Sequence, residues 1–158
     1  MAVLQSGSVT PGHAAIWATD GVIRDGGALP AAQKVLASFL NADFNDTGDQ
    51  PLILPAALTA FQLTGIIVTA ATLSLTTAVG GFYPEAAQAG TPLVADTQVY
   101  SSLTTSAKLL SCTLAGAVAT TLYTRANLPD WSVYFSLTTP QGAAANANIF
   151  LLGMDLSP

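Results

Sequence analysis

The region from residue 51 onward alternates short apolar runs with turn residues, and this rhythm most constrains the fold. The clearest run spans residues 130–138. Its apolar residues occupy every second position: Trp131, Val133, Phe135 and Leu137. The positions between them carry Ser, Tyr, Ser and Thr. A period of two matches the side-chain alternation of a strand with one buried face, so we expect a half-buried strand here.

Similar runs recur along the rest of this region. They are residues 52–54, 61–69, 72–76, 82–83, 97–100, 110–114, 120–123 and 148–156. About eight strands in roughly 105 residues, with turn residues at regular spacing, are typical of an antiparallel β-sandwich. Two of the runs, 61–69 and 149–154, are apolar on both faces. We therefore expect these two strands to be central in a sheet or covered on their outer side.

Residues 29–50 have a different pattern. Pro30 suits the first position of a helix, where its missing N–H has no partner to lose. A stripe at helical spacing follows, made of Val35, Leu36, Phe39 and Leu40. Asn41 and the polar residues up to Gln50 end the stripe. The sequence thus predicts a short helix from Leu29 to about Leu40 and a linker to residue 50, ahead of a β-sandwich over 51–158.

Residues 1–28 form an N-terminal arm. Two apolar clusters, 14–17 and 22–23, are separated by Thr19-Asp20-Gly21. Asp-Gly between apolar runs predicts a hairpin, because glycine adopts the positive φ that the turn needs. Such a hairpin buries too little surface to be stable alone, so we expect it to dock on another surface. The expected docking residues are Val9, Pro11, His13, Ile16, Trp17, Val22 and Ile23.

Trp17 is the expected anchor of this arm, because aromatic side chains are the usual hot spots of interfaces. The alternative is a tryptophan that folds onto its own domain.

The composition limits the partners of the chain. Only 8% of the 158 residues are charged, against roughly a quarter in an average protein. Low charge suits a surface that is largely covered by partners. The net charge is −5, and the four basic residues are scattered: Arg24, Lys34, Lys108 and Arg125. This argues against nucleic-acid binding and against a polybasic membrane anchor. We expect no secretory signal in residues 1–7 and no membrane span in the uncharged stretch 50–84.

The residues that carry chemistry are few. His13 is the single histidine, and Ser6 and Ser8 beside it lack the context of an activated nucleophile. We interpret His13 as a turn or docking residue, since one histidine cannot make a His-rich zinc site. Cys112 alternates with Leu110 and Leu114, which favours a core position over a reactive thiol. We therefore expect no catalytic residues and no cofactor.

Residues 43–49 place oxygen-bearing side chains at alternate positions: Asp43, Asn45, Thr47 and Asp49. This resembles the first half of an EF-hand loop, but the twelfth position is Leu54 where a bidentate Glu is required. We interpret the segment as a linker with Asx turns and predict no metal site, a weak cation site being the alternative. Gly80-Gly81 and Gly26-Gly27 are too sparse for phosphate-binding loops.

Several segments resemble known proteins. Residues 8–13 (SVTPGH), 17–23 (WATDGVI) and 25–27 (DGG) resemble the opening of many tailed-phage virion proteins, among them head-decoration, head-fibre and tail-fibre proteins. Residues 79–83 (VGGFY), 89–95 (AGTPLVA), 98–104 (QVYSSLT) and 134–144 (YFSLTTPQGAA) resemble a β-domain that recurs in phage structural proteins. The resemblance implies a jelly roll, an arrangement that virion proteins often use.

The function implied by this resemblance is structural. A capsid decoration, or cement, protein would bind the major capsid protein on the virion surface and associate with itself, with a trimer favoured at a three-fold axis. The alternative is a tail or head-fibre protein with a β-domain that binds a host surface or carbohydrate. A virion hydrolase is a third hypothesis, disfavoured because the sequence offers no general base beside a nucleophile and no carboxylate pair.

Overall fold

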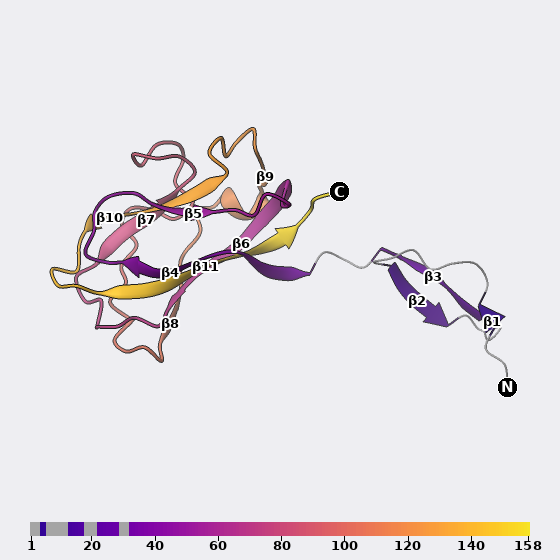
Figure 1. Cartoon of the computed structure of the whole chain (residues 1–158), viewed down its shortest axis with the longest axis horizontal. Coiled ribbons are helices and arrows are strands. Elements are labelled where there is room, and N and C mark those ends of the chain that lie inside the picture. The colour runs from indigo at the N-terminus through magenta and orange to yellow at the C-terminus, as the bar shows by residue number, and fades with distance from the viewer. Residues whose placement is uncertain (1–3, 6–12, 18–21, 29–31) are drawn as a thin grey trace. The chain divides into compact units, whose positions relative to one another are not determined.

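The computed structural model describes residues 4–5, 13–17, 22–28 and 32–158, and it divides the chain into two units (Figure 1). The first unit is Met1–Ala31 and the second is Ala32–Pro158. Each has its own sheets, so each is described by itself. Among the described residues, no helix has the length and hydropathy needed to cross a membrane.

The N-terminal unit is a three-stranded sheet with the order β1-β3-β2. Its strands are β1 (Leu4–Gln5), β2 (His13–Trp17) and β3 (Val22–Ala28). β2 and β3 are antiparallel, with Trp17 opposite Ile23. This pair is the predicted hairpin, although its turn, residues 18–21, lies outside the described residues. The parallel partner β1 was not predicted, because two residues are too few to show a period.

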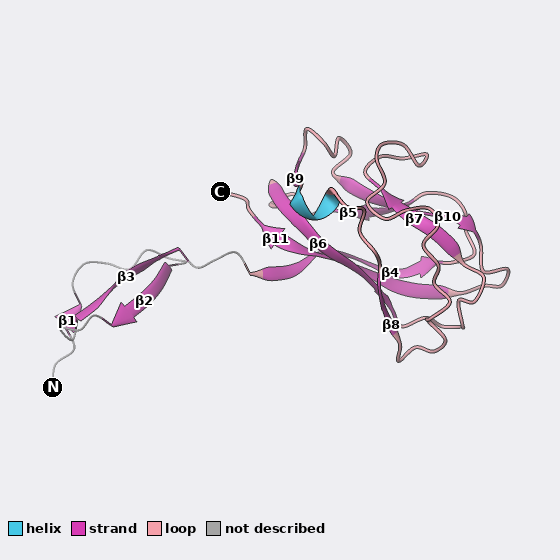
Figure 2. Ribbon diagram, turned by 180° about the vertical axis from the view of Figure 1, so that it is seen from behind, coloured by secondary structure: helices cyan, strands magenta, loops and turns pink. Residues whose placement is uncertain are grey.

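The second unit consists of two antiparallel sheets (Figure 2). The larger has the order β4-β11-β6-β8, with β9 also paired to β6. Its strands are β4 (Gln33–Asp43), β6 (Ala60–Thr69), β8 (Leu109–Ser111), β9 (Leu122–Thr124) and β11 (Asn146–Asp155). The smaller, ordered β5-β10-β7, contains β5 (Gln50–Ile53), β7 (Val79–Tyr83) and β10 (Ser132–Thr139). A 3-10 turn, η1 (Val118–Thr120), is the helical element of the described chain.

The predicted mainly β class and antiparallel sandwich are confirmed by these two sheets. The jelly-roll arrangement stays a prediction. The two runs that are apolar on both faces form β6 and β11, which are neighbours inside the larger sheet, as expected for central strands.

The core lies between the sheets and is rich in aromatic rings. Phe135 of β10 is at its centre, with ring centroids 4.8 Å from Phe44, 5.1 Å from Phe82 and 6.0 Å from Tyr100. The apolar positions of the 130–138 run are all buried, as the period-two pattern predicts: Trp131, Val133, Phe135 and Leu137. Such tilted and edge-on contacts between buried rings add to the stabilisation from apolar burial.

The predicted helix over residues 29–40 is wrong, since residues 33–43 form strand β4. Two β-bulges explain the misleading pattern. Between the pairs Leu151–Ala37 and Leu152–Val35, β4 carries Leu36 as an extra residue. Near Asn41 it carries a second extra residue, and Asn41 has a φ of 59°. Each bulge shifts the alternation by one position, so a strand acquires an apolar spacing that imitates a helix.

Two predicted strands, 72–76 and 97–100, are also wrong. Residues 72–76 form loop and bend structure in which Leu73 is exposed while Leu75 is buried. The Leu75 N–H donates to the Leu103 carbonyl outside any ladder. In the second segment, Val99 makes only an isolated bridge to Val79. Alternation in short segments therefore did not guarantee a strand partner.

Candidate functional site

The predicted docking residues fall in the N-terminal unit. His13, Ile16 and Trp17 belong to β2, while Val22 and Ile23 belong to β3. The strand register places Trp17 opposite Ile23, and β1 pairs with β3 at Val22 and Ile23. Val9 and Pro11 lie outside the described residues.

Of the two roles expected for His13, the turn is wrong, because the backbone of His13 begins β2 opposite Ala28. Its role as a docking residue stays a prediction. Strand β2 includes the apolar cluster 14–17 and begins one residue before it, at His13. Pro11-Gly12, just before His13, is a turn signal and suggested that the strand begins later.

The loop between β4 and β5 contains the acidic segment 43–49. Its side-chain oxygens accept hydrogen bonds from backbone N–H groups. Asp43 Oδ1 accepts from Asn45 N at 2.7 Å, and Asp46 Oδ1 accepts from Gly48 N at 2.8 Å. Asn45 Oδ1 accepts from Gly142 N at 2.9 Å. The predicted Asx turns are confirmed, and these oxygens serve to hold the loop in place.

Cys112 is 5% exposed and belongs to the core cluster, and Leu110 and Leu114 pack against this cluster. Burial raises the pKa of its thiol to about 12. At neutral pH the thiol is therefore protonated and poorly nucleophilic. The core interpretation of Cys112 is confirmed.

Gly80 and Gly81 lie in β7, where neighbouring backbones approach closely. A Cβ on Gly80 would be 2.4 Å from the Ser136 carbonyl oxygen, and one on Gly81 would be 2.5 Å from the Val94 carbonyl oxygen. Real Cβ atoms do not approach backbone at such distances, so both positions need glycine for close packing. The close packing of β7 therefore explains the Gly80-Gly81 pair without a phosphate-binding role.

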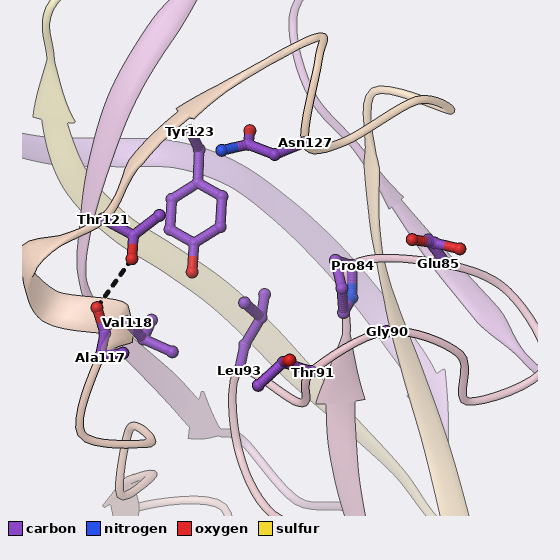
Figure 3. A pocket seen from close by; sticks show the side chains of 10 residues that line it. All are labelled: Pro84, Glu85, Gly90, Thr91, Leu93, Ala117, Val118, Thr121, Tyr123 and Asn127. Atoms are coloured by element: carbon purple, nitrogen blue, oxygen red, sulfur yellow. Dashed lines mark hydrogen bonds between the residues drawn. The ribbon is translucent and has the colours of Figure 1, made fainter.

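A surface cavity of about 380 Å³ lies beside β9 and η1 (Figure 3). Tyr123, Thr121 and Val118 border one side of it, and Pro84, Gly90 and Thr91 border the other. Figure 3 shows the Tyr123 ring with its hydroxyl directed into the space near Val118 and Leu93. Cavities of this size hold small ligands, so it is a candidate binding site.

The polar groups around this cavity are mostly engaged within the fold. Asn127 accepts from the Thr124 N–H at 2.7 Å and donates to the Leu122 carbonyl at 2.8 Å. Thr121 Oγ1 donates to the Ala117 carbonyl at 2.8 Å. Tyr123 is only 6% exposed and stacks on Phe61. Burial raises the pKa of Tyr123, which keeps its hydroxyl neutral at physiological pH. The lining thus offers apolar contact and neutral hydroxyls, together with the carboxylate of Glu85.

Charged groups of the second unit make isolated local contacts. Lys34 Nζ and Asp155 Oδ2 form an ion pair at 2.6 Å. Hydrogen bonds from Lys34 and Ser157 lower the pKa of Asp155 to about 2. Arg125 lies 4.8 Å from the ring centre of Trp131. Within residues 32–158 and the described strands of the first unit, no three His, Cys, Asp or Glu side chains form a group suited to a metal ion.

Sequence reasoning missed the cavity, because loops 84–91 and 117–127 that border it are far apart in the chain. The aromatic Tyr123 within a predicted strand was the only signal available for it.

No protein-family model, curated protein or solved structure matches this chain.

Proposed function

We propose that this chain is a non-enzymatic structural protein of a tailed-phage virion, a capsid decoration protein that docks through its N-terminal unit. The observation that carries the proposal is the division at Ala31: a sheet of three short strands precedes a sandwich that has its own core. A sheet as small as β1-β3-β2 gains most of its stability from a surface that it packs against. The resemblance of residues 8–27 to the opening of virion proteins, head-decoration proteins among them, supports the capsid shell as that surface.

The work of such a protein is mechanical. Each copy would bury surface across joints between subunits of the major capsid protein, which raises the free energy needed to rupture the shell. The low charge of the chain, 8% of its residues, supports extensive contact with protein. Apolar and hydrogen-bonded contacts then supply the affinity, with little contribution from long-range electrostatic attraction.

The test compares virions of the parent phage with and without this protein. Immunogold labelling should decorate the whole head, and particles that lack the protein should assemble but release DNA at a lower temperature. Adding back the full chain should restore heat resistance, whereas Trp17→Ala should restore less, because Trp17 is the expected anchor. Label confined to the tail tip, or equal heat resistance of the two particles, would contradict the proposal.

A host-surface-binding fibre protein is the second candidate, supported by the cavity beside Tyr123. Its hydroxyls, its apolar walls and the carboxylate of Glu85, which can accept hydrogen bonds, suit a small hydroxyl-bearing ligand such as a sugar ring. Titration of the isotope-labelled full chain with neutral monosaccharides should then shift the amide resonances of residues 117–127. A tail-fibre role predicts tail-tip labelling, so one immunogold experiment separates a tail fibre from a decoration protein.

A further inference from the structure

The outer face of the larger sheet, on the side away from the core, carries a group of apolar side chains that crosses its strands. On β11, Ile149 and Leu151 are fully buried, so the alternating Phe150, Leu152 and Met154 point the other way. The ladders bring residues of neighbouring strands beside them. Phe150 is opposite Ile67 of β6, and Leu152 is opposite Val35 of β4.

The face continues onto the far edge strand, β8. Leu109 is opposite Thr69 of β6, and Leu109 and Val35 are both more than half exposed. We call the surface formed by Val35, Ile67, Leu109, Phe150, Leu152 and Met154 the outer sheet face. The other positions that the ladders place on this side carry Gln, Ser, Thr, Asn, Gly and Ala residues and a further leucine, Leu122 of β9. One charged residue, Asp43, is on this side at the end of β4, opposite Asn146. An antiparallel sheet that meets water on one side normally carries polar and charged residues there.

The outer side of the smaller sheet is covered by a loop of the same chain. Ser136 of β10 alternates with the core residues Phe135 and Leu137 and therefore faces outward, yet it is buried. Gln88 donates to Ser136 Oγ at 3.1 Å, and Thr138 Oγ1 donates to the Asp96 carbonyl at 3.2 Å. The loop that contains Gln88 and Asp96 thus lies over this outer side and covers it. On the outer sheet face, by contrast, Val35 and Leu109 are exposed, and Ile67, Phe150, Leu152 and Met154 are partly exposed.

We propose that the outer sheet face packs against the same face of a second copy of this chain, forming a two-fold pair. When one surface patch of a chain contacts the identical patch of a second copy, the contact is isologous and forms a closed two-fold pair. Two sheets packed face to face with interdigitating side chains reproduce the arrangement of a sandwich core. This inference does not depend on whether the chain belongs to a virion.

The size of the face is sufficient for a stable pair. Strands β4, β6 and β11 have ten or eleven residues and span about 33 Å each, whereas the three residues of β8 span about 10 Å. With strands about 4.8 Å apart, these lengths give a face of roughly 530 Å². Two such faces bury roughly 1,100 Å² in total, which passes the area of about 1,000 Å² that a specific interface needs. The six residues of the outer sheet face are uncharged, and the carboxylate of Asp43 lies at the end of β4 outside them. This limits both repulsion between identical copies and the cost of burying ions. Homodimer interfaces are likewise more apolar than ordinary surface.

The test measures the mass of the full chain in solution by light scattering and sedimentation. The wild-type chain should have twice the 16.0 kDa of one copy. Ile67→Glu places a carboxylate in the middle of the face and should raise the dissociation constant at least about tenfold, because the charge must be desolvated in the pair. Val35→Glu should act in the same direction. It lies on an edge strand at a side chain that is 53% exposed, so it leaves the fold intact even if Ile67→Glu does not.

Ile53→Glu is the matched control, since it makes the same chemical change on β5 of the other sheet at a side chain that is 73% exposed. It should remain a pair. Circular dichroism confirms that each variant is folded. The proposal is overturned by a monomeric or trimeric wild type, by a pair that Ile67→Glu and Val35→Glu leave intact, or by equal dissociation of Ile53→Glu. Coverage of the face by a capsid subunit or by the N-terminal unit would give the monomeric result.

Discussion

Replacing Gln50 should loosen the corner where the chain passes from one sheet to the other. Gln50 is buried at the start of β5, and its side chain makes two hydrogen bonds with the backbone of Asp43 at the end of β4. The Asp43 N–H donates to Oε1 at 2.8 Å, and Nε2 donates to the Asp43 carbonyl at 2.7 Å. One amide thus closes the loop that contains the Asx turns.

The cost of Gln50→Met follows from these two bonds. Methionine keeps the volume of the side chain but removes both the oxygen that accepts from the Asp43 N–H and the nitrogen that donates to the Asp43 carbonyl. Each lost bond costs about 1 kcal/mol, and a backbone group left unpaired in a buried place costs up to about 3 kcal/mol. The Asp43 side chain is exposed, so water reaches part of this backbone and the lower end applies. We expect a loss of about 2–3 kcal/mol, which corresponds to a fall in Tm of roughly 6–12 °C.

Urea unfolding, followed by the fluorescence of the buried Trp131, measures this loss in the full chain. Gln50→Glu is the control, since it keeps the acceptor for the Asp43 N–H and replaces the donor by a carboxylate oxygen. Ionised, that carboxylate faces the Asp43 carbonyl, so its pKa is raised in the folded state. Its stability deficit should therefore shrink as the pH falls and the introduced group regains a proton to donate. If Gln50→Met lowered the free energy of unfolding by less than about 0.5 kcal/mol, the two hydrogen bonds of Gln50 would not hold this corner together.

Three further predictions concern other parts of the second unit. Gly81→Ala should destabilise the fold by more than about 3 kcal/mol, because its Cβ meets the Val94 carbonyl, whereas Gly116→Ala, with open space around it, should change the urea midpoint little. The thiol of Cys112 has a pKa of about 12, so about one in ten thousand Cys112 side chains is a thiolate at pH 8. Cys112 should therefore react with a thiol reagent at pH 8 only when the chain unfolds. Rapid labelling of the native chain would contradict its burial. The pKa of Asp155 is lowered from 3.8 to about 2, so its ionised form stabilises the fold above about pH 4 and this contribution is lost as the pH falls toward 2. Asp155→Asn should consequently flatten the acid limb of a Tm-against-pH curve, and an unchanged limb would show that the ion pair with Lys34 does not contribute.

The two proposals assign different work to the two units. The N-terminal unit would provide attachment, and the sandwich would provide the body and a second interface through its outer sheet face. A decoration protein that pairs across a two-fold axis would link neighbouring capsid subunits. The three-fold expectation came from capsid symmetry, whereas the outer sheet face favours a pair. Mass measurements and immunogold labelling therefore test separate statements.

The sequence by itself determined the class of the fold and the burial of particular residues. The alternation in 130–138 identified the core side of β10, because one buried face imposes a period of two. The runs that are apolar on both sides marked β6 and β11 as central strands. The neighbours of Cys112 predicted its place in the core, and the spacing of Asp and Asn in 43–49 predicted the Asx turns. These features depend on local spacing, which a single sequence displays.

Only the tertiary structure decided which segments find partners. The bulges of β4 depend on its register with β11, so the sequence of residues 33–43 alone showed an apolar spacing that favoured a helix. Residues 72–76 alternate as well as some true strands do, yet no neighbouring edge pairs with them. The cavity beside Tyr123 and the outer sheet face both join residues from distant strands. Their existence depends on strand order, and strand order is set by the packing of the whole core rather than by any local pattern.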